Sequence, residues 1–166
     1  MVSCGVCGEE LIVPCGPPDS AIFLAGEHPG EREIETGIPF KGQAGDILRS
    51  EIFRFNAFKY ADCRTGNLWL HKKVKTCDLT WHVEQFLDEL RKHKVALLMG
   101  SEFGKGVLYE GSVNDRVGLT IDIAGVRCVI APHPASIAKA GGSVGEFRFA
   151  LRTLSKLILD EEDIDG

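Results

Sequence analysis

The most informative segment of this chain is Ala21-Ile22-Phe23-Leu24-Ala25, followed directly by Gly26-Glu27-His28-Pro29-Gly30. The apolar run predicts a buried strand over Ser20–Gly26. A buried strand that ends in a glycine-flanked acid places the Glu27 carboxylate at the carboxyl edge of a sheet, where open α/β folds bind their ligands. The glycines and the proline then shape a loop whose backbone can approach a substrate closely. Glu27 is therefore the first candidate functional residue.

Beyond this segment, the chain alternates between expected strands and expected helices. The strands are predicted at Asn56–Cys63 and Val95–Met99, with a hairpin formed by Val117–Ile123 and Val126–Ala131. The helices are predicted at Ala44–Phe53, Asp78–His93, Phe103–Val107 and Val144–Leu159. This alternation is typical of an α/β domain with a mostly parallel central sheet.

Length and composition indicate a single domain. At 166 residues and 44% hydrophobic, the chain can bury a core of its own, which we assign to residues 1–159. No apolar run approaches the ~20 residues that span a bilayer, and the first residues lack the pattern of a signal peptide. We therefore expect a soluble intracellular monomer, cytoplasmic or associated with the nucleoid, with no membrane partner.

Charge is unevenly distributed along the chain. The net charge is −5, and the acids of residues 160–166, which we expect to form a disordered tail, account for all of it. Between Arg49 and Lys75, basic residues outnumber acidic ones. Such a band can follow the phosphates of a nucleic acid, although a solvated charged surface gives the same pattern.

Six cysteines in an intracellular chain do not indicate a disulfide framework. Cys4-x-x-Cys7, which we call the N-terminal clip, is the usual bidentate pair for zinc or an iron–sulfur cluster, and it can also be redox-active. A closed four-thiolate site needs two more ligands. Cys63 and Cys77 stand at segment ends from which side chains can reach a shared point, and Cys15 is the spare candidate.

A second candidate for the sheet edge is His133. The strand predicted at Val126–Ala131 runs straight into Pro132-His133-Pro134-Ala135-Ser136, so this histidine is held between two prolines near the edge that carries Glu27. The alternative is a loop histidine with only a local hydrogen bond.

Taken in order, these pieces resemble the iron–sulfur uracil-DNA glycosylases, families 4 and 5 of that superfamily, over nearly the whole chain. Gly26–Gly30 is similar to their Gly-Glu-Ala-Pro-Gly motif, and Gly37-Ile38-Pro39-Phe40-Lys41-Gly42-Gln43-Ala44-Gly45 to their Gly-x-Pro-Phe-Val-Gly-x-Ala-Gly. Cys63-Arg64 resembles their Cys-Arg-Pro, and Pro132–Ala135 their closing His-Pro-Ser motif. The resemblance implies a three-layer α/β/α domain with a four-stranded sheet.

The resemblance also implies a cofactor and a reaction. Cys4, Cys7, Cys63 and Cys77 would hold a structural 4Fe–4S cluster, with zinc as the alternative occupant. The reaction would be hydrolysis of the N-glycosidic bond of uracil, or of a related pyrimidine, in DNA after base flipping.

Roles for individual residues follow from the same resemblance. Glu27 would orient a water and His133 would donate a hydrogen bond to the uracil oxygen that gains charge. Phe40 would stack on the flipped base, in a pocket that Gly26 and His28 help to line. The polar edge of the base would be read by Asn56 or Lys59, and Lys139 would meet a backbone phosphate.

Departures from the motifs keep other functions open. His28 replaces a small residue, Arg64 is not followed by proline, and Ala135 replaces a serine. These changes suit an enzyme for a modified thymine or a 5-substituted uracil. They also suit a non-catalytic DNA-binding or partner-binding module, and a zinc-stapled α/β protein unrelated to DNA is a further reading.

Overall fold

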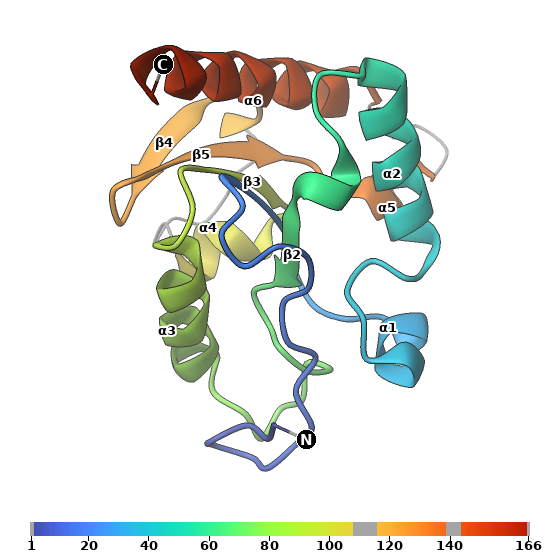
Figure 1. Cartoon of the computed structure of the whole chain (residues 1–166). Coiled ribbons are helices and arrows are strands. Elements are labelled where there is room, and N and C mark those ends of the chain that lie inside the picture. The colour runs from blue at the N-terminus through green and yellow to red at the C-terminus, as the bar shows by residue number, and fades with distance from the viewer. Residues whose placement is uncertain (1, 108–115, 139–143, 166) are drawn as a thin grey trace.

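The computed structural model describes residues 2–107, 116–138 and 144–165. Its strands are β1 (Ile22–Gly26), β2 (Arg64–Asn67), β3 (Val95–Met99), β4 (Thr120–Ile123) and β5 (Val126–Ala131). They form one sheet in the order β2-β1-β3-β5-β4 (Figure 1). The neighbours β2, β1, β3 and β5 pair in parallel, and β4 pairs antiparallel with β5. The predicted α/β fold with a mostly parallel sheet is confirmed, with β4 adding a fifth strand at one edge.

Helices cover both faces of the sheet (Figure 1). On one face, Leu24 of β1 belongs to an apolar cluster with Leu48 and Leu154 from the helices α2 and α6. On the other face, Phe23 clusters with Phe86 from α3. Adjacent residues of β1 thus enter opposite cores, as the alternation of side chains along a strand requires. The helices are α1 (Glu31–Thr36), α2 (Gln43–Phe55), α3 (Leu79–Leu90), α4 (Glu102–Gly106), α5 (Pro134–Ile137) and α6 (Val144–Asp165), with a 3₁₀ turn at Tyr60–Asp62.

The second strand lies later in the chain than predicted. Helix α2 continues through Phe55, and Asn56 ends it with a left-handed backbone (φ 56°) whose N–H donates to the carbonyl of Ile52. A strand over Asn56–Cys63 is therefore wrong, and β2 is the polar segment Arg-Thr-Gly-Asn that follows. Its lack of an apolar pattern hid it from sequence analysis.

The acidic C-terminal residues continue helix α6 through Asp165 rather than leaving it at Leu159. Glu161, in this extension, forms an ion pair with Arg127 of β5. The residues predicted as a disordered tail are helical wherever the structure describes them. None of the described helices combines the length and apolar character that a membrane span requires.

The N-terminal segment runs beside β2 and covers its outer edge. Cys15 and Thr65 exchange two backbone hydrogen bonds of 2.8 Å, and the N–H of Ile12 donates to the carbonyl of Leu70 at 2.6 Å. Gly66 is tightly packed here, since a Cβ would lie 3.2 Å from Pro14. This contact carries the N-terminal clip toward the loop between β2 and α3 (Figure 1).

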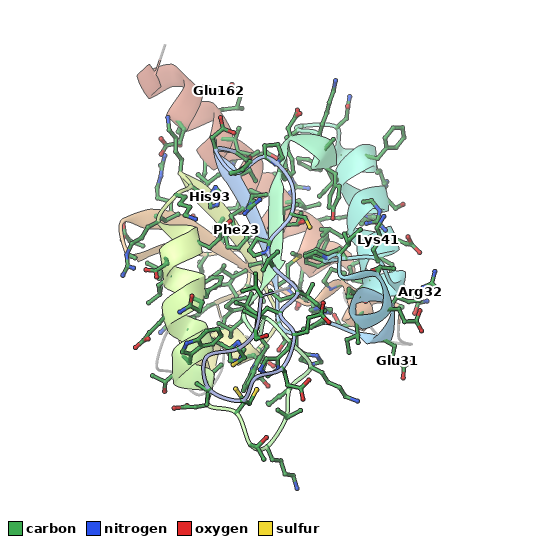
Figure 2. All side chains as sticks on the ribbon, turned by 60° about the horizontal axis from the view of Figure 1, so that its bottom comes forward. Phe23, Glu31, Arg32, Lys41, His93 and Glu162 are labelled. Atoms are coloured by element: carbon green, nitrogen blue, oxygen red, sulfur yellow. The ribbon has the colours of Figure 1, made fainter. Side chains whose placement is uncertain are left out.

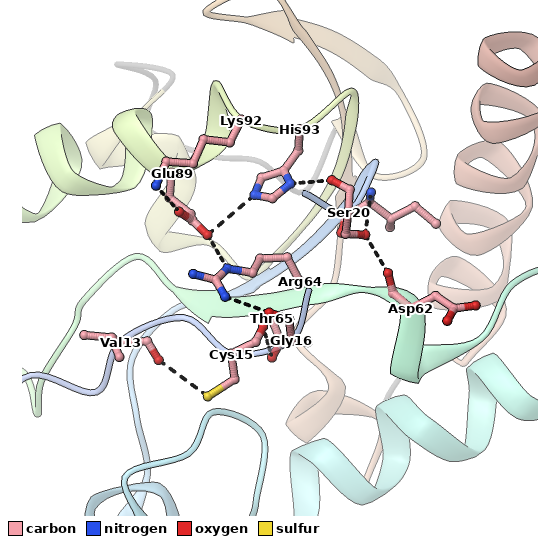
Figure 3. Close-up of polar contacts among 11 residues, drawn as sticks. Val13, Cys15, Gly16, Ser20, Asp62, Arg64, Thr65, Glu89, Lys92 and His93 are labelled. Atoms are coloured by element: carbon pink, nitrogen blue, oxygen red, sulfur yellow. Dashed lines mark hydrogen bonds and ion pairs between the residues drawn. The ribbon is translucent and has the colours of Figure 1, made fainter. Parts of the chain in front are cut away.

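A polar network ties β2 to α3 at the amino edge of the sheet (Figure 3). Arg64 forms an ion pair with Glu89, which Lys92 contacts at 3.2 Å. Burial by itself would raise the pKa of Glu89, but hydrogen bonds from His93, Arg64 and Lys92 outweigh it and lower the pKa to about 2. The ring of His93 also stacks on Phe23, with ring centroids 5.1 Å apart (Figure 2). The side chain of Arg64 therefore has a structural role, joining β2 to α3.

Candidate functional site

A cavity of about 690 Å³ opens at the carboxyl ends of the parallel strands. Glu27 follows β1, Asn67 ends β2, Gly100 follows β3 and His133 follows β5, and all four line the cavity. Glu31 and Arg32 of α1 line it from one side and are labelled in Figure 2. Glu27 and His133 follow different strands and line the same cavity, which is the arrangement expected of strand ends at one edge of the sheet.

Two neighbouring backbone features hold the Glu27 carboxylate. Its Oε2 accepts a hydrogen bond from the N–H of Glu102 at 3.0 Å. Gly100 packs directly beneath it, since a Cβ there would lie 2.2 Å from the carboxyl carbon of Glu27. Burial is the main cause that raises the pKa of Glu27, with the hydrogen bond from Glu102 acting in the opposite direction. The carboxylate is thus positioned by a backbone donor and by the space that Gly100 leaves beside it.

His133 is a neutral donor by virtue of its surroundings. The N–H of Ala135 donates to His133 Nδ1 at 3.2 Å, so the neutral ring carries its proton on Nε2. Burial, followed by the charge of nearby His28, lowers the pKa of His133 to about 4. The side chain of His28 is itself exposed while lining the same cavity.

Phe40 lines the cavity from a constrained position. Its backbone is left-handed (φ 58°), which is unusual for a bulky residue and is concentrated at functional sites. Arg49 donates to the Phe40 carbonyl at 2.6 Å, and Gly45 lets that carbonyl approach, since a Cβ would lie 1.8 Å from it. Gly26 has the same function beneath the ring, where a Cβ would lie 3.1 Å from Phe40 Cζ.

A group of thiols and imidazoles lies near the same side of the sheet, where the N-terminal clip meets the loop between β2 and α3. The donor atoms of Cys4, His71, Cys77 and His82 all lie within 4.8 Å of one another. Cys7 Sγ lies 3.2 Å from His71 Nε2 and joins them. We call these five residues the Cys/His group. Its chemistry could hold a metal ion.

Cys63 does not belong to this group. It lies at the amino end of β2 within the apolar core, 1% exposed, and its thiol donates to the carbonyl of Lys59 at 3.4 Å. The predicted four-cysteine set is therefore corrected, because Cys63 stands at the amino end of β2 whereas the clip meets the loop that follows the carboxyl end. His71 and His82, which the sequence analysis missed, occupy the places beside Cys4, Cys7 and Cys77. Cys15 also lies elsewhere, with its thiol 3.8 Å from the Val13 carbonyl (Figure 3).

Comparison with protein families gives a match to the family model of the uracil DNA glycosylase superfamily over residues 13–155. The chain belongs to the uracil DNA glycosylase superfamily. The match spans the whole cavity and begins after the N-terminal clip. Membership supports DNA glycosylase chemistry in general, and the fold and cavity described above agree with it.

One further polar residue of the cavity was not predicted from the sequence. Asn67 is buried at the end of β2 and lines the cavity, and its Oδ1 would lie 2.7 Å from a Cβ at Gly26. Sequence analysis missed Asn67 because it belongs to β2, a polar segment that no apolar pattern marks as a strand.

The two residues predicted for base reading lie elsewhere. Asn56 and Lys59 line a second cavity of about 520 Å³ with Ser20 and Lys94, at the amino edge of the sheet. They lie at the opposite edge of the sheet from the cavity that holds Glu27 and His133, so this prediction is corrected. Lys139 lies outside the described residues.

Proposed function

We propose that this superfamily member is a DNA glycosylase that hydrolyses the N-glycosidic bond of uracil, or of a related pyrimidine, in DNA. The observation that carries the proposal is the convergence of Glu27 and His133, from different strand ends, on one cavity that Phe40 and Asn67 also line. A carboxylate and a neutral imidazole donor are the groups that a departing anionic base and a positively charged sugar require.

The base must leave the duplex before it can reach this cavity. Unpairing and unstacking cost a few kcal/mol, and less for a mispaired base. Stacking on an aromatic ring returns ~1–3 kcal/mol, so Phe40 offsets much of this cost. The Asn67 amide can both donate and accept, which matches the adjacent N3–H and O4 of uracil.

Bond cleavage then places negative charge on the base and positive charge on the sugar. His133 donates its Nε2–H to the uracil oxygen that gains charge, and a donor of this kind in a dry site contributes ~2.7–4 kcal/mol. Glu27, held by the N–H of Glu102, orients a water toward C1′ and stabilises the positive sugar. The proton of the attacking water passes to the Glu27 carboxylate as the C–O bond forms.

The Cys/His group would hold a metal away from the reacting atoms and would act structurally. A 4Fe–4S cluster of the kind implied by the sequence resemblance is held by four cysteine thiolates. The described group offers three thiolates, from Cys4, Cys7 and Cys77, and two imidazoles.

The test is incubation of the purified protein with labelled uracil-containing oligonucleotides, single-stranded and paired, followed by alkaline cleavage at abasic sites. We expect Glu27→Gln to lower the rate by ~10²–10⁴-fold and His133→Ala by ~10²–10³-fold. Asn56→Ala, at the opposite edge of the sheet, is the matched control and should retain the wild-type rate. If the folded wild-type protein binds these oligonucleotides and releases no uracil, uracil excision is excluded, and a related pyrimidine substrate or a binding module remains.

A second substrate class is favoured by His28. This exposed residue lines the cavity beside Glu27 and interacts electrostatically with His133, where the related motif has a small residue. A ring donor at that place could meet a polar group on C5 of a modified thymine or a 5-substituted uracil. A panel of 5-substituted substrates tests this, with His28→Ala expected to shift the preference toward unmodified uracil. An unchanged preference would eliminate the idea.

A further inference from the structure

The two histidines of the Cys/His group are held in opposite tautomers by backbone partners. His71 Nδ1 lies 2.7 Å from the carbonyl oxygen of Lys72. Because a carbonyl can only accept, Nδ1 carries the ring proton and His71 Nε2 presents a free lone pair. That nitrogen faces Cys7 Sγ at 3.2 Å. A metal-binding histidine is typically oriented by such a hydrogen bond from its other ring nitrogen to a carbonyl.

His82 has the reverse arrangement. The backbone N–H of Leu70 donates to His82 Nδ1 at 3.1 Å, so Nδ1 carries no proton and the neutral ring is protonated at Nε2. This Nε2–H lies 3.4 Å from Cys77 Sγ and 3.1 Å from His71 Nε2. A protonated ring nitrogen cannot bind a metal, but it can donate to a thiolate or to a free lone pair. His82 is therefore placed as a donor rather than a ligand.

The remaining donors number three thiols and one imidazole, and their spacing is short. Cys4 Sγ lies 3.6 Å from Cys77 Sγ, and Cys7 Sγ lies 3.2 Å from His71 Nε2. Tetrahedral zinc, with bonds of about 2.3 Å to sulfur and about 2.0 Å to nitrogen, sets its donors roughly 3.5–3.8 Å apart. In a 4Fe–4S cluster each thiolate binds a different iron, so the sulfurs stand farther from one another.

The surroundings support a closed structural site. The backbone N–H of Val6 points at Cys4 Sγ at 3.5 Å, as expected beside a thiolate. The rings of Trp69 and Trp81 pack against His82, with centroids 4.7 Å and 5.0 Å away, and fix its orientation. Gly5 lies against the Trp81 indole, where a Cβ would be 3.0 Å from Nε1.

We propose that Cys4, Cys7, His71 and Cys77 form a tetrahedral site for a single zinc ion, with His82 donating a hydrogen bond to the Cys77 thiolate. The donor set and its spacing do not fit a four-iron cluster. The site fastens the N-terminal clip to the loop between β2 and α3. This inference stands apart from the glycosylase proposal, because it concerns the metal and not the reaction.

The first experiment uses the wild-type protein, expressed with both iron and zinc in the medium. We expect about one zinc per chain, no acid-labile sulfide and a colourless sample. X-ray absorption at the zinc edge should report three sulfur ligands at about 2.3 Å and one nitrogen ligand at about 2.0 Å. Stoichiometric iron and sulfide, with a brown colour and absorbance at roughly 400 nm, would overturn the proposal. The outcome of the glycosylase assay does not depend on this result.

The second experiment separates ligand from donor with variants loaded with Co²⁺, whose visible ligand-field bands report tetrahedral coordination. His71→Ala should lose the tetrahedral spectrum, whereas His71→Cys should keep one ion bound. His82→Ala should keep the coordination and weaken binding by ~10–100-fold, as loss of a hydrogen bond to a ligand does. Cys63→Ala is the control and should bind Co²⁺ as the wild type does. Loss of the tetrahedral spectrum in His82→Ala, with retention in His71→Ala, would reverse the ligand assignment and refute it.

Discussion

Replacing Gly100 by alanine is expected to lower the rate of base excision in a protein that still folds. The added Cβ would lie 2.2–2.3 Å from the carboxyl carbon, Cγ and Oε1 of Glu27, whereas ordinary contacts begin at 3.4 Å. The carboxylate must therefore retreat by about 1 Å, and a misplacement of this size costs on the order of 10²-fold in rate. The backbone at Gly100 (φ 125°) also strains alanine, at about 1–3 kcal/mol.

Gly125 offers the matched control. It lies in the turn between β4 and β5, has a positive φ of 82°, and has nothing within 4 Å of an added Cβ. Gly125→Ala should therefore show backbone strain alone, about 1–2 kcal/mol, which lowers Tm by roughly 2–8 °C in a domain of this size. Single-turnover excision of uracil at saturating enzyme, together with thermal unfolding, separates the two effects. If Gly100→Ala excises uracil as fast as Gly125→Ala does, Glu27 is not the group that the reaction needs.

Further predictions concern pH, the polar network and the metal. The excision rate should fall with decreasing pH as Glu27 is protonated. This should happen at a pH above the ordinary 4.5, because the pKa of Glu27 is raised. His133, whose pKa is lowered to about 4, becomes charged only at a lower pH. A pH–rate profile whose acidic limb lies at or below 4.5 would contradict this assignment. Glu89→Gln should lower the free energy of unfolding by ~3 kcal/mol at pH 7, because a pKa depressed to about 2 contributes stability above pH 4.5 that is lost as pH falls toward 2. Urea titrations at pH 7 and pH 3 check this, since the gap between variant and wild type must narrow at the lower pH. Removal of the proposed metal with a chelator should expose residues 2–12 to limited proteolysis, detected by mass spectrometry, while circular dichroism shows that the sheet stays folded. Unfolding of the sheet together with exposure of residues 2–12 would contradict this.

The sequence predicted those parts of the fold in which local pattern and tertiary environment agree. β1, β3 and β5 are apolar runs because helices bury both of their faces, and each was located correctly. β2 could not be located in this way. The close approach of Pro14 explains Gly66, and the cavity explains Asn67; strand propensity explains neither residue.

The candidate site divides along the same line. Glu27, Phe40 and His133, which line the cavity, could be proposed from the sequence because each follows a recognisable segment or stands in a glycine-rich loop. The proposed metal ligands lie in loops that meet only in the folded chain, and Cys63 was chosen by residue type although its side chain enters the core. The roles of His71 and His82 depend on which backbone group meets each Nδ1, which no sequence pattern records.

The pairing of the N-terminal segment with β2 also bears on the tendency of the sheet to aggregate. A bare outer strand offers its unpaired N–H and C=O groups as a template on which another chain can add, which leads to aggregation. Here Ile12 and Cys15 occupy part of that template from within the same chain. If the Cys/His group binds the proposed zinc, the ion fixes the start of this segment and so protects the sheet edge against self-association. Loss of that zinc from stored protein would then be seen first as turbidity.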